Sequence, residues 1–434
     1  MSIVTPIVIV GGGAGGLELA AKLGRKYGPS QVYLVDKDAD HIWKPSLHEV
    51  AAGTLDIHRE GLSYFMLARD CNFTFILGAL EQLDKEKKEI QLAPAYNEAG
   101  QVLFPRRTIA YGTLVIAVGS KSNFFNTPGA AEHAITLDAT QQAEHFRLKL
   151  LHALTQQQGD ASTANQLEPL HIAIVGGGAT GVELAAELTE AVASLHFYGA
   201  NTLTPERHLA ITLIEGAERI LVALPEELSI RATQLLTSRN IKVCTGVRVT
   251  EVQENQLIDQ HGTTYQADLC VWAAGIQAPS FLTTLGLETN RIHQLVVNER
   301  LETADPHIYA IGDCAQAPWW GEQGNLPARA QVAHQQASYL VKVLGAKMRG
   351  KPMTTPFQYK DYGSLVSVGH SKGVGSLMGV LSGKSWFVEG LVARIMYMSL
   401  HLMHHAAVLG VVRTFSLALG RLLLKRSAPR IKLH

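Results

Sequence analysis

The sequence has few of the features that mark secreted or nucleic-acid-binding proteins. It holds four cysteines in 434 residues, Cys71, Cys244, Cys270 and Cys314, and no two of them form a C-x-x-C pair. This scatter favours a reducing compartment over a disulfide scaffold. The formal net charge of +0 gives no reason to expect a nucleic-acid partner. No charged segment followed by an apolar run precedes Ile7, so we expect no signal peptide.

A metal site is not expected either. His48 and Glu49 begin an H-E-x-x-H pattern, but residue 52 is an alanine where a zinc metalloprotease needs its second histidine. The segment Asp40–Gly53 around them mixes charged and aromatic residues, unlike a core element. Two interpretations stay open for this segment, namely a surface loop and a loop that reaches over the far end of a cofactor.

Acidic residues are absent from the end of the chain. Residues 390–434 contain seven Lys and Arg and no Asp or Glu, which leaves 31 bases against 38 acids in residues 1–389. The body of the protein is therefore acidic and its C-terminal region basic. Positive charge without acids is typical of segments that lie on an anionic membrane surface.

The same region contains an uncharged run of 18 residues, Ile395–Val412. A membrane-spanning helix needs about 17 to 25 residues, but the three histidines in this run argue against a span. A helical wheel places Arg394, His401 and His405 on one face, with His404 at its flank, and Met403 on the opposite, apolar face. We therefore predict amphipathic membrane-attaching helices from about residue 390. An apolar dimer interface and a packed C-terminal helix pair remain alternatives.

The strongest motif is the stretch Ile7–Asp36. Four apolar residues predict a buried parallel strand, and Gly11, Gly13 and Gly16 after it fit the G-x-G-x-x-G pattern. The helix that follows would face a pyrophosphate with its N-terminus. Asp36 lies twenty residues past Gly16, where an acid accepts hydrogen bonds from ribose hydroxyls. The stretch therefore predicts a dinucleotide site.

A second copy of this unit begins about 165 residues later, at Ile172. Its glycines are Gly176, Gly178 and Gly181, and its second-strand acid is Glu215. That acid lies 34 residues past the last glycine, longer than the roughly 20 expected, which indicates a loop insertion. A carboxylate there would repel a 2′-phosphate and favours NAD over NADP.

Three later segments have the composition of strands that approach a ligand. Thr113–Ser120 and Ala267–Gly275 are apolar and end in small residues, which let backbone and ligand come close. His307–Ala315 ends in Gly-Asp, and Asp313 is interpreted either as a helix cap or as a contact to a cofactor. Gln331–Lys347 predicts a helix. Strands alternating with helices predict an α/β fold with two Rossmann-like units.

Together these motifs resemble the flavoproteins with two dinucleotide-binding domains, and within them the bacterial type II NADH dehydrogenases, which are single-chain NADH:quinone oxidoreductases. The resemblance runs nearly from end to end of the chain. Its final segment looks like the A-Q-x-A-x-Q quinone motif of that family. The segments that carry it are Trp43–Pro45, Leu47–Ala51, Gly176–Glu187, Val271–Ile276, Ala310–Ala315 and Ala330–Gln335.

The resemblance implies a first domain that binds FAD without a covalent bond and a second that binds NADH. The residues it assigns to FAD are Gly11, Gly13, Gly16, Asp36, Lys44, Gly119 and Asp313. Those it assigns to NADH are Gly176, Gly178, Gly181 and Glu215. Gln331 and Gln335 would line the quinone pocket, and Glu183 occupies the position of a family glutamate in the quinone half-reaction. The alternative for Glu183 is an acid that favours the helix dipole.

The same resemblance implies FAD-binding segments 1–125 and 283–347, an inserted NADH-binding domain 126–282, and a C-terminal region 348–434. The expected activity is that of a respiratory NADH:quinone oxidoreductase that pumps no protons, using ubiquinone or menaquinone. It would be a peripheral protein on the cytoplasmic face of a bacterial membrane, and a homodimer is left open. Rival functions are a sulfide:quinone oxidoreductase, which needs paired redox cysteines, and an NADH-responsive flavin-binding sensor.

Overall fold

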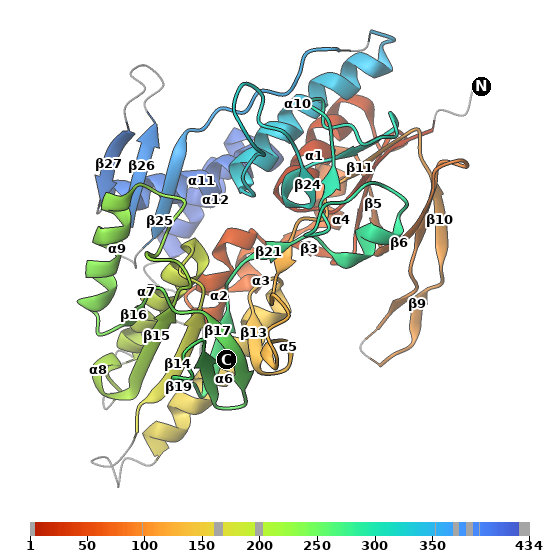
Figure 1. The fold of residues 1–434 in the computed structure, drawn as a ribbon. Helices are drawn as coiled ribbons and strands as arrows, with labels where there is room; N and C mark the ends of the chain where they lie inside the picture. Colours follow the sequence, from red (N-terminus) through yellow and green to blue (C-terminus); the bar gives the residue numbers. More distant parts are fainter. Residues whose placement is uncertain are drawn as a thin grey trace.

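Two five-stranded parallel sheets organise the chain (Figure 1). A computed structural model describes residues 5–97, 99–159, 168–195, 203–351, 353–367, 373–378, 385–389 and 391–424. The first sheet has the order β23 (Ile308–Ala310), β11 (Thr113–Ile116), β1 (Ile7–Val10), β2 (Val32–Asp36) and β5 (Thr74–Leu77). The second has the order β13 (Ala134–Thr136), β20 (Leu269–Trp272), β14 (Leu170–Val175), β15 (Leu209–Ile214) and β16 (Lys242–Cys244).

Each unit contains the strand, turn and helix predicted from its glycine motif. All four residues of β1 are buried, which suits a central parallel strand covered on both faces. The helix α1 (Ala14–Tyr27) follows β1, and α7 (Ala179–Leu195) follows β14. In both units the strand before the helix pairs in parallel with the strand after it. The predicted α/β fold with two Rossmann-like units is therefore confirmed.

The first unit is completed by a late segment of the chain. The strand β23 pairs with β11 only after residues 134–272 have supplied the whole second sheet. The helix α10 (Ala330–Met348) then packs beside α1. The two segments that connect the sheets pair with each other as short antiparallel strands, β12 (Lys121–Ser122) and β21 (Ile276–Gln277). The domain limits at residues 125, 282 and 347 stay a prediction.

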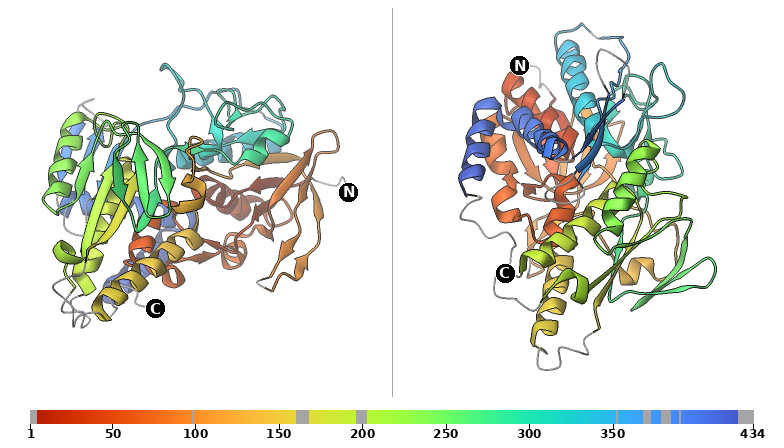
Figure 2. Two further views of the ribbon diagram at one scale, coloured as in Figure 1. Left: turned by 60° about the horizontal axis from the view of Figure 1, so that its bottom comes forward. Right: turned by 90° about the vertical axis from the view of Figure 1, so that its left-hand side faces the viewer.

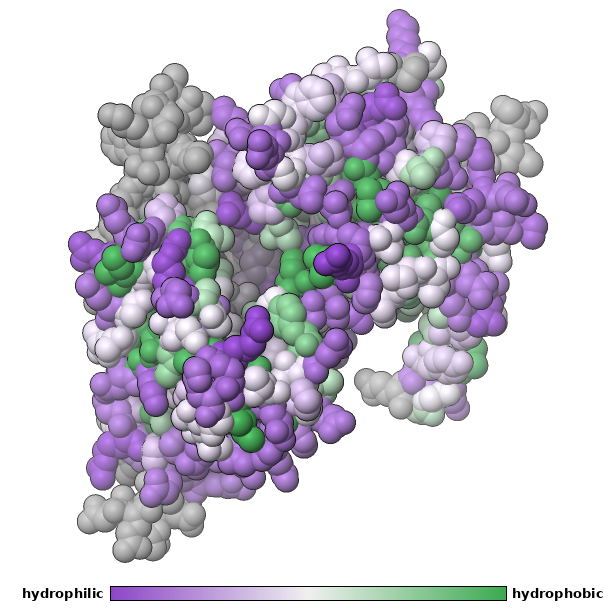
Figure 3. Space-filling view, viewed as in Figure 1, coloured by the Kyte–Doolittle hydropathy of each residue, from purple (hydrophilic) through white to green (hydrophobic). Residues whose placement is uncertain are grey.

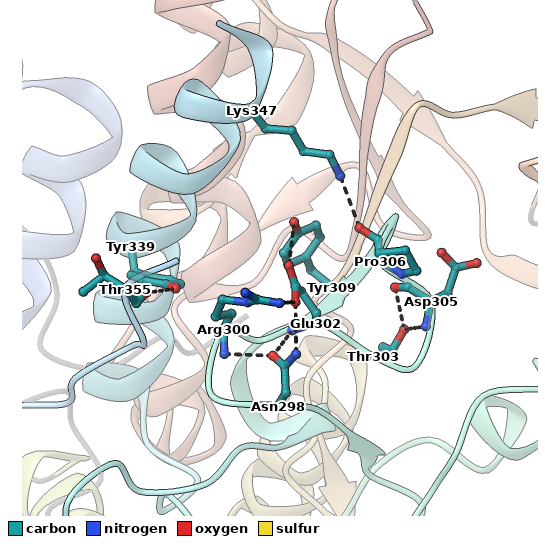
Figure 4. Close-up of polar contacts among 10 residues, drawn as sticks. All are labelled: Asn298, Arg300, Glu302, Thr303, Asp305, Pro306, Tyr309, Tyr339, Lys347 and Thr355. Carbon is teal, nitrogen blue, oxygen red and sulfur yellow. Dashed lines mark hydrogen bonds and ion pairs between the residues drawn. The ribbon is translucent and has the colours of Figure 1, made fainter. Parts of the chain in front are cut away.

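Polar contacts order the turn that leads into β23, and one of them joins it to α10 (Figure 4). The Asn298 side chain accepts hydrogen bonds from the backbone N–H groups of Arg300 and Glu302, at 2.8 and 3.1 Å. The Arg300 guanidinium donates to the Glu302 carboxylate at 2.7 Å. From α10, the Lys347 ammonium donates to the carbonyl oxygen of Pro306 at 3.2 Å. The C-terminal end of α10 is thereby tied to the first unit, and its N-terminal turn carries the predicted quinone motif.

Smaller sheets and helices surround these two units. The antiparallel sheets are β6 (Leu80–Asp84), β7 (Glu89–Leu92) and β10 (Arg107–Ala110); β17 (Val249–Gln253), β18 (Gln256–Asp259) and β19 (Thr264–Gln266); and β25 (Gly363–Ser367), β26 (Gly373–Met378) and β27 (Ser385–Glu389). Two-stranded pairs are β3 (Asp40–His41) with β4 (Leu62–Ser63), β8 (Ala95–Tyr96) with β9 (Val102–Phe104), and β22 (Leu295–Val296) with β24 (Ala315–Gln316). The remaining α-helices are α2 (Leu47–Ala52), α3 (Ile57–Glu60), α4 (Tyr64–Cys71), α5 (Ala130–His133), α6 (Thr140–Gly159), α8 (Pro205–His208) and α9 (Glu226–Thr237).

The C-terminal region forms two helices, α11 (Leu391–Leu409) and α12 (Val411–Leu424), near the predicted start. The wheel's assignment of the faces of α11 was wrong, because His404 and His405 are buried whereas Met403 is 56% exposed. Burial is possible because each imidazole has a polar partner: Nε2 of His404 lies 2.9 Å from Nε2 of His41, and Nδ1 of His405 lies 3.0 Å from the His401 carbonyl oxygen. Arg394 lies outside the described side chains.

The helix α11 packs on α1 and α4 of the first unit, as the blue and red helices of Figure 2 show. Val408 is fully buried in the first core. The next helix, α12, keeps Val411, Val412 and Phe415 mostly exposed. No helix within the described residues is both long enough and apolar enough to cross a bilayer. The basic residues beyond 424 lie outside the described part of the chain.

Candidate active site

One cavity of about 3300 Å³ extends between the two units. The space-filling view is hollowed near its centre, between the two halves of the molecule (Figure 3). Both glycine turns open onto this cavity, together with residues 40–49, the first turn of α10, β25 and parts of α11 and α12. The predicted site residues that line it are Gly11, Gly13, Asp36, Lys44, Gly119, Gly176, Gly178, Glu183, Glu215, Asp313 and Gln331.

The first glycine turn has the shape of a dinucleotide cradle. Gly11 has a φ of +101°, and a Cβ on it would lie 2.4 Å from the Ala117 carbonyl oxygen. A Cβ on Gly16 would lie 1.9 Å from the Gly11 carbonyl oxygen, so the helix approaches the turn too closely for any side chain. Gly13 would meet nothing within 4 Å and lines the cavity. The residues present therefore fit a pyrophosphate at the N-terminus of α1.

The second turn repeats this geometry. Gly176 has a φ of +112°, and a Cβ on it would lie 2.6 Å from the Ala274 backbone nitrogen. A Cβ on Gly181 would lie 2.0 Å from the Gly176 carbonyl oxygen, whereas Gly178 would meet nothing within 4 Å. Each glycine of the second unit thus has the same steric role as its counterpart in the first.

Glu215 is the structural counterpart of Asp36 despite its longer spacing. In the first unit, the Asp36 carboxylate accepts from the Gly12 N–H at 2.6 Å and from the N–H two residues after itself at 2.9 Å. In the second, the Glu215 carboxylate accepts from the Gly177 N–H at 2.6 Å and from the Ala217 N–H at 2.8 Å. Both acids are thereby held beside a glycine turn, where ribose hydroxyls would meet them.

Lys44, Gly119 and Asp313 meet around Ser120. The Lys44 ammonium donates to the Ser120 carbonyl oxygen at 2.7 Å, and the Ser120 hydroxyl donates to the Asp313 carboxylate at 2.8 Å. Gly119 has a φ of +70°, which turns the chain directly after β11. Asp313 lies within a short 3₁₀ turn after β23. Three residues from distant segments therefore share one edge of the cavity.

Glu183 is buried in the first turns of α7 and faces α2 of the other unit. Its Oε1 accepts a hydrogen bond from the Ser367 N–H at 2.9 Å, and its Oε2 lies 3.6 Å from Nδ1 of His48. Burial raises the pKa of Glu183 well above its usual value, and the carboxylates of Glu49 and Glu187 raise it further. The side chain is thus suited to hold a proton at neutral pH.

The two motif glutamines have different surroundings. Gln331 lines the cavity, and its Oε1 accepts from the Tyr359 hydroxyl at 2.5 Å. Gln335 makes two hydrogen bonds with the backbone of Lys360, at 2.8 and 3.0 Å, and is not among the residues that line the cavity. Their assignment to a quinone pocket stays a prediction. A neighbour that the sequence analysis missed, Gln336, is buried and accepts from the Gly312 N–H at 2.7 Å.

The segment Asp40–Gly53 lines the cavity and is not a surface loop. It forms a 3₁₀ turn, Lys44–Ser46, and the helix α2, which packs against α6 and α7 of the second unit. Its His48 side chain is 2% exposed. His48 was not predicted as a site residue. Its signals in the sequence were the mixture of charged and aromatic residues around it and its place in Leu47–Ala51, one of the segments that carry the family resemblance.

The cysteines do not form a redox pair. None of the four is in a disulfide within the described residues. The Cys314 thiol is buried beside the Ile311 carbonyl oxygen at 3.3 Å, and burial raises its pKa to about 12. A thiolate nucleophile is therefore disfavoured at the position nearest Asp313.

Comparison with known proteins agrees with this site. Residues 5–337 match the family described as pyridine nucleotide-disulphide oxidoreductase. The chain is 41% identical over 445 residues to the type II NADH:quinone oxidoreductase of Haemophilus influenzae, covering 99% of each, and 26% identical to that of Staphylococcus aureus, covering 89% of this chain and 93% of that one.

Two solved structures share the fold. NDH2 from Plasmodium falciparum in complex with NADH has a TM-score of 0.78 at 20% identity, over 99% of this chain and 100% of that one. The sulfide:quinone oxidoreductase from Aquifex aeolicus has a TM-score of 0.70 at 17% identity, over 97% and 96%. The sequence match to the H. influenzae protein spans both chains almost completely, so the chain belongs to the type II NADH:quinone oxidoreductases of the pyridine nucleotide-disulphide oxidoreductase family.

Proposed function

We propose that this protein oxidises NADH and reduces a membrane quinone through bound FAD, without pumping protons. The observation that carries the proposal is the cavity itself. Two dinucleotide cradles, each with its own acid, open onto one space that also contains Glu183 and Gln331. Two cradles in series need two different occupants, and a shared cavity allows both substrates to reach the same cofactor.

The first unit would hold FAD, through its glycine turn, Asp36, Lys44 and Asp313. The second unit would hold NADH, through its glycine turn and Glu215. When bound, the flavin supplies the chemistry that converts hydride transfer from a nicotinamide into electron transfer to a quinone. The protein contributes orientation, closeness of the two sites and one proton per turnover, because oxidation of NADH and reduction of a quinone to quinol consume one proton overall. Glu183 is the residue suited to supply that proton at its Oε2 atom.

The test is an anaerobic stopped-flow experiment on the flavin-loaded protein. Added NADH should bleach the flavin absorbance at once, and a short-chain ubiquinone or menaquinone should then restore it. Bleaching without recovery would exclude the quinone assignment. Turnover separates an enzyme from a sensor, because a sensor would stop after oxidising about one NADH per flavin.

Selectivity for NADH should depend on the charge of Glu215. We expect Glu215→Gln to narrow the preference for NADH over NADPH about tenfold, since a repulsion of about 1.4 kcal/mol corresponds to that factor. Glutamine keeps one oxygen, which can accept from the Gly177 N–H, and loses the hydrogen bond that Glu215 accepts from the Ala217 N–H. The measurement is kcat/KM for both nucleotides with a soluble acceptor. An unchanged ratio would mean that another residue meets the 2′ position.

Membrane attachment is part of the proposal, and α12 is its proposed contact. Val412 and Phe415 are 80% and 68% exposed on this helix, beside the basic Arg413. Apolar area with positive charge favours peripheral binding to an anionic surface, which we place on the cytoplasmic face of the membrane, where NADH is available. A dimer interface on the same face is the competing explanation.

We expect the double variant Val412→Glu and Phe415→Glu to lose sedimentation with anionic liposomes. Oxidation of NADH by a soluble acceptor should continue, since neither residue lines the cavity. The control is Ile230→Glu, which changes an apolar residue that is 51% exposed on α9. Unchanged sedimentation of the double variant would place the attachment elsewhere, and a change in oligomeric state would identify a dimer interface. Substitution is preferable to deletion from residue 390, which would remove the buried Val408.

A further inference from the structure

We infer that His48 is the relay through which Glu183 regains a proton from solvent, with Glu49 as the outer acid of the path. The inference rests on the proposed function, in which Glu183 gives a proton to the quinone. His48 acts through Glu183, so it is a positioning residue and not a catalytic one.

The His48 imidazole lies between two carboxylates of different exposure. Its Nδ1 is 3.6 Å from Oε2 of Glu183, and its Nε2 is 4.0 Å from Oε1 of Glu49. The exposed fractions of the side chains are 7% for Glu183, 2% for His48 and 29% for Glu49, so Glu49 is the most exposed of the three groups. Both separations exceed a hydrogen bond by about 0.5 to 1 Å. Such contacts commonly tighten when a substrate is bound.

Glu183 needs a partner of this kind because its carboxylate is costly in this environment. Once its proton has left, Oε1 keeps the hydrogen bond from Ser367, but Oε2 carries charge beside Glu49 and Glu187 in a buried site. Glu187 is itself held by the Thr54 hydroxyl at 2.5 Å. Reprotonation at Oε2 needs a proton donor that faces this atom, and His48 is the imidazole that does so.

The ring is suited to pass a proton in either direction. Burial lowers the pKa of His48 to about 4, although a hydrogen bond to the Pro45 backbone opposes the shift, so the resting imidazole is neutral. A neutral imidazole has one nitrogen that donates and one that accepts. It can therefore receive a proton on one side and release one on the other.

A proton passes from Glu49 to Nε2 of His48, and the proton on Nδ1 passes to Oε2 of Glu183, which becomes a neutral acid again. Glu49 takes a proton from solvent. Before the next turnover the ring gives up its Nε2 proton to water and takes one from water at Nδ1, which restores the starting tautomer with no change in the charge of the ring. No electrons move in this step, and the net change is one proton carried from solvent to the buried carboxylate.

The direct test is hydrogen–deuterium exchange of the Glu183 acid in the flavin-loaded protein, followed by infrared spectroscopy. The carboxylic C=O band that disappears in Glu183→Gln identifies the acid. Transfer into D2O should shift this band quickly in the wild type and about 10²-fold more slowly in His48→Asn. Asparagine can place an N–H where Nδ1 lies, so it keeps a hydrogen bond to Glu183 but cannot carry a proton. A purely structural role would therefore survive in this variant.

The matched control is His133→Asn, because His133 is a partly exposed histidine 3.9 Å from its neighbour Glu132 and lies outside the cavity. Its exchange should equal that of the wild type. Glu49→Gln blocks the outer end of the path and should slow exchange even if His48→Asn does not fold. Wild-type exchange rates in both His48→Asn and Glu49→Gln would overturn the inference.

The experiment separates this inference from the proposed function. Exchange of the acid requires no quinone, so slow exchange in His48→Asn supports the relay whatever the acceptor is. Failure of quinone to restore the wild-type flavin absorbance would remove the proposed function alone.

Discussion

Glu183→Gln is expected to lower quinone-dependent turnover by about 10²-fold or more, the usual contribution of a general acid. Glutamine can still accept the Ser367 hydrogen bond at Oε1, so the position of the side chain is preserved. It has no proton to give, which is the only property removed. Reoxidation of the reduced flavin by a short-chain quinone, followed anaerobically, should slow far more than reduction by NADH.

The control for this variant is Glu190→Gln, which changes a carboxylate on the same helix that pairs with Arg239 at 3.0 Å. Its effect on quinone reduction should be small. If Glu183→Gln reduced quinone at the wild-type rate, Glu183 would be only an acid that favours the helix dipole. The cavity would then need another proton donor.

The second large effect should come from the closest approaches in the two glycine turns. Gly16→Ala puts a Cβ 1.9 Å from the Gly11 carbonyl oxygen, and Gly181→Ala puts one 2.0 Å from that of Gly176. Neither turn can relax without a shift of the backbone, and such a shift destabilises the fold by about 1–3 kcal/mol or more. We expect Gly16→Ala to purify without flavin. Gly181→Ala should keep its flavin absorbance but lose bleaching by NADH, with KM raised about 10²-fold.

Gly13→Ala separates crowding of the protein from crowding of the cofactor. A Cβ on Gly13 meets no protein atom within 4 Å, so the thermal midpoint of the flavin-free protein should not change. Flavin affinity, measured by titration of that protein, should fall because the side chain points into the cavity. If Gly181→Ala lost flavin and Gly16→Ala kept it, the two cradles would have been assigned in the wrong order.

Local patterns predicted the two cradles well because a strand, a glycine turn and a helix are specified by neighbouring residues. The buried run Ile7–Val10 and the spacing of the glycines need no distant partner to be recognised. Glu215 was harder to recognise from the sequence, since α7 extends to Leu195 and the short α8 comes before β15, which lengthens the spacing from the last glycine. Only the matching hydrogen bonds to Gly177 and Ala217 identify it as the equivalent of Asp36.

The parts that the sequence did not predict depend on distant segments. A helical wheel treats histidine as polar, so it cannot anticipate that His404 is buried against His41, which lies 363 residues earlier. His48 is likewise buried only because α2 of the first unit packs on α7 of the second. Burial of a polar side chain needs a partner, and such partners are not visible in local periodicity.

The contact between His404 and His41 links the C-terminal region to the flavin cradle. His41 donates from Nδ1 to the Gly12 carbonyl oxygen at 2.9 Å, and the Tyr64 hydroxyl donates to the same oxygen at 2.7 Å. Displacing α11 would therefore remove the hydrogen-bond partner of His41, one of the two side chains that hold the glycine turn. Thermodynamic reciprocity then requires that a change which stabilises the packing of α11 also strengthens the binding of flavin. Loss of flavin in turn destabilises the packing of α11 by the same free energy.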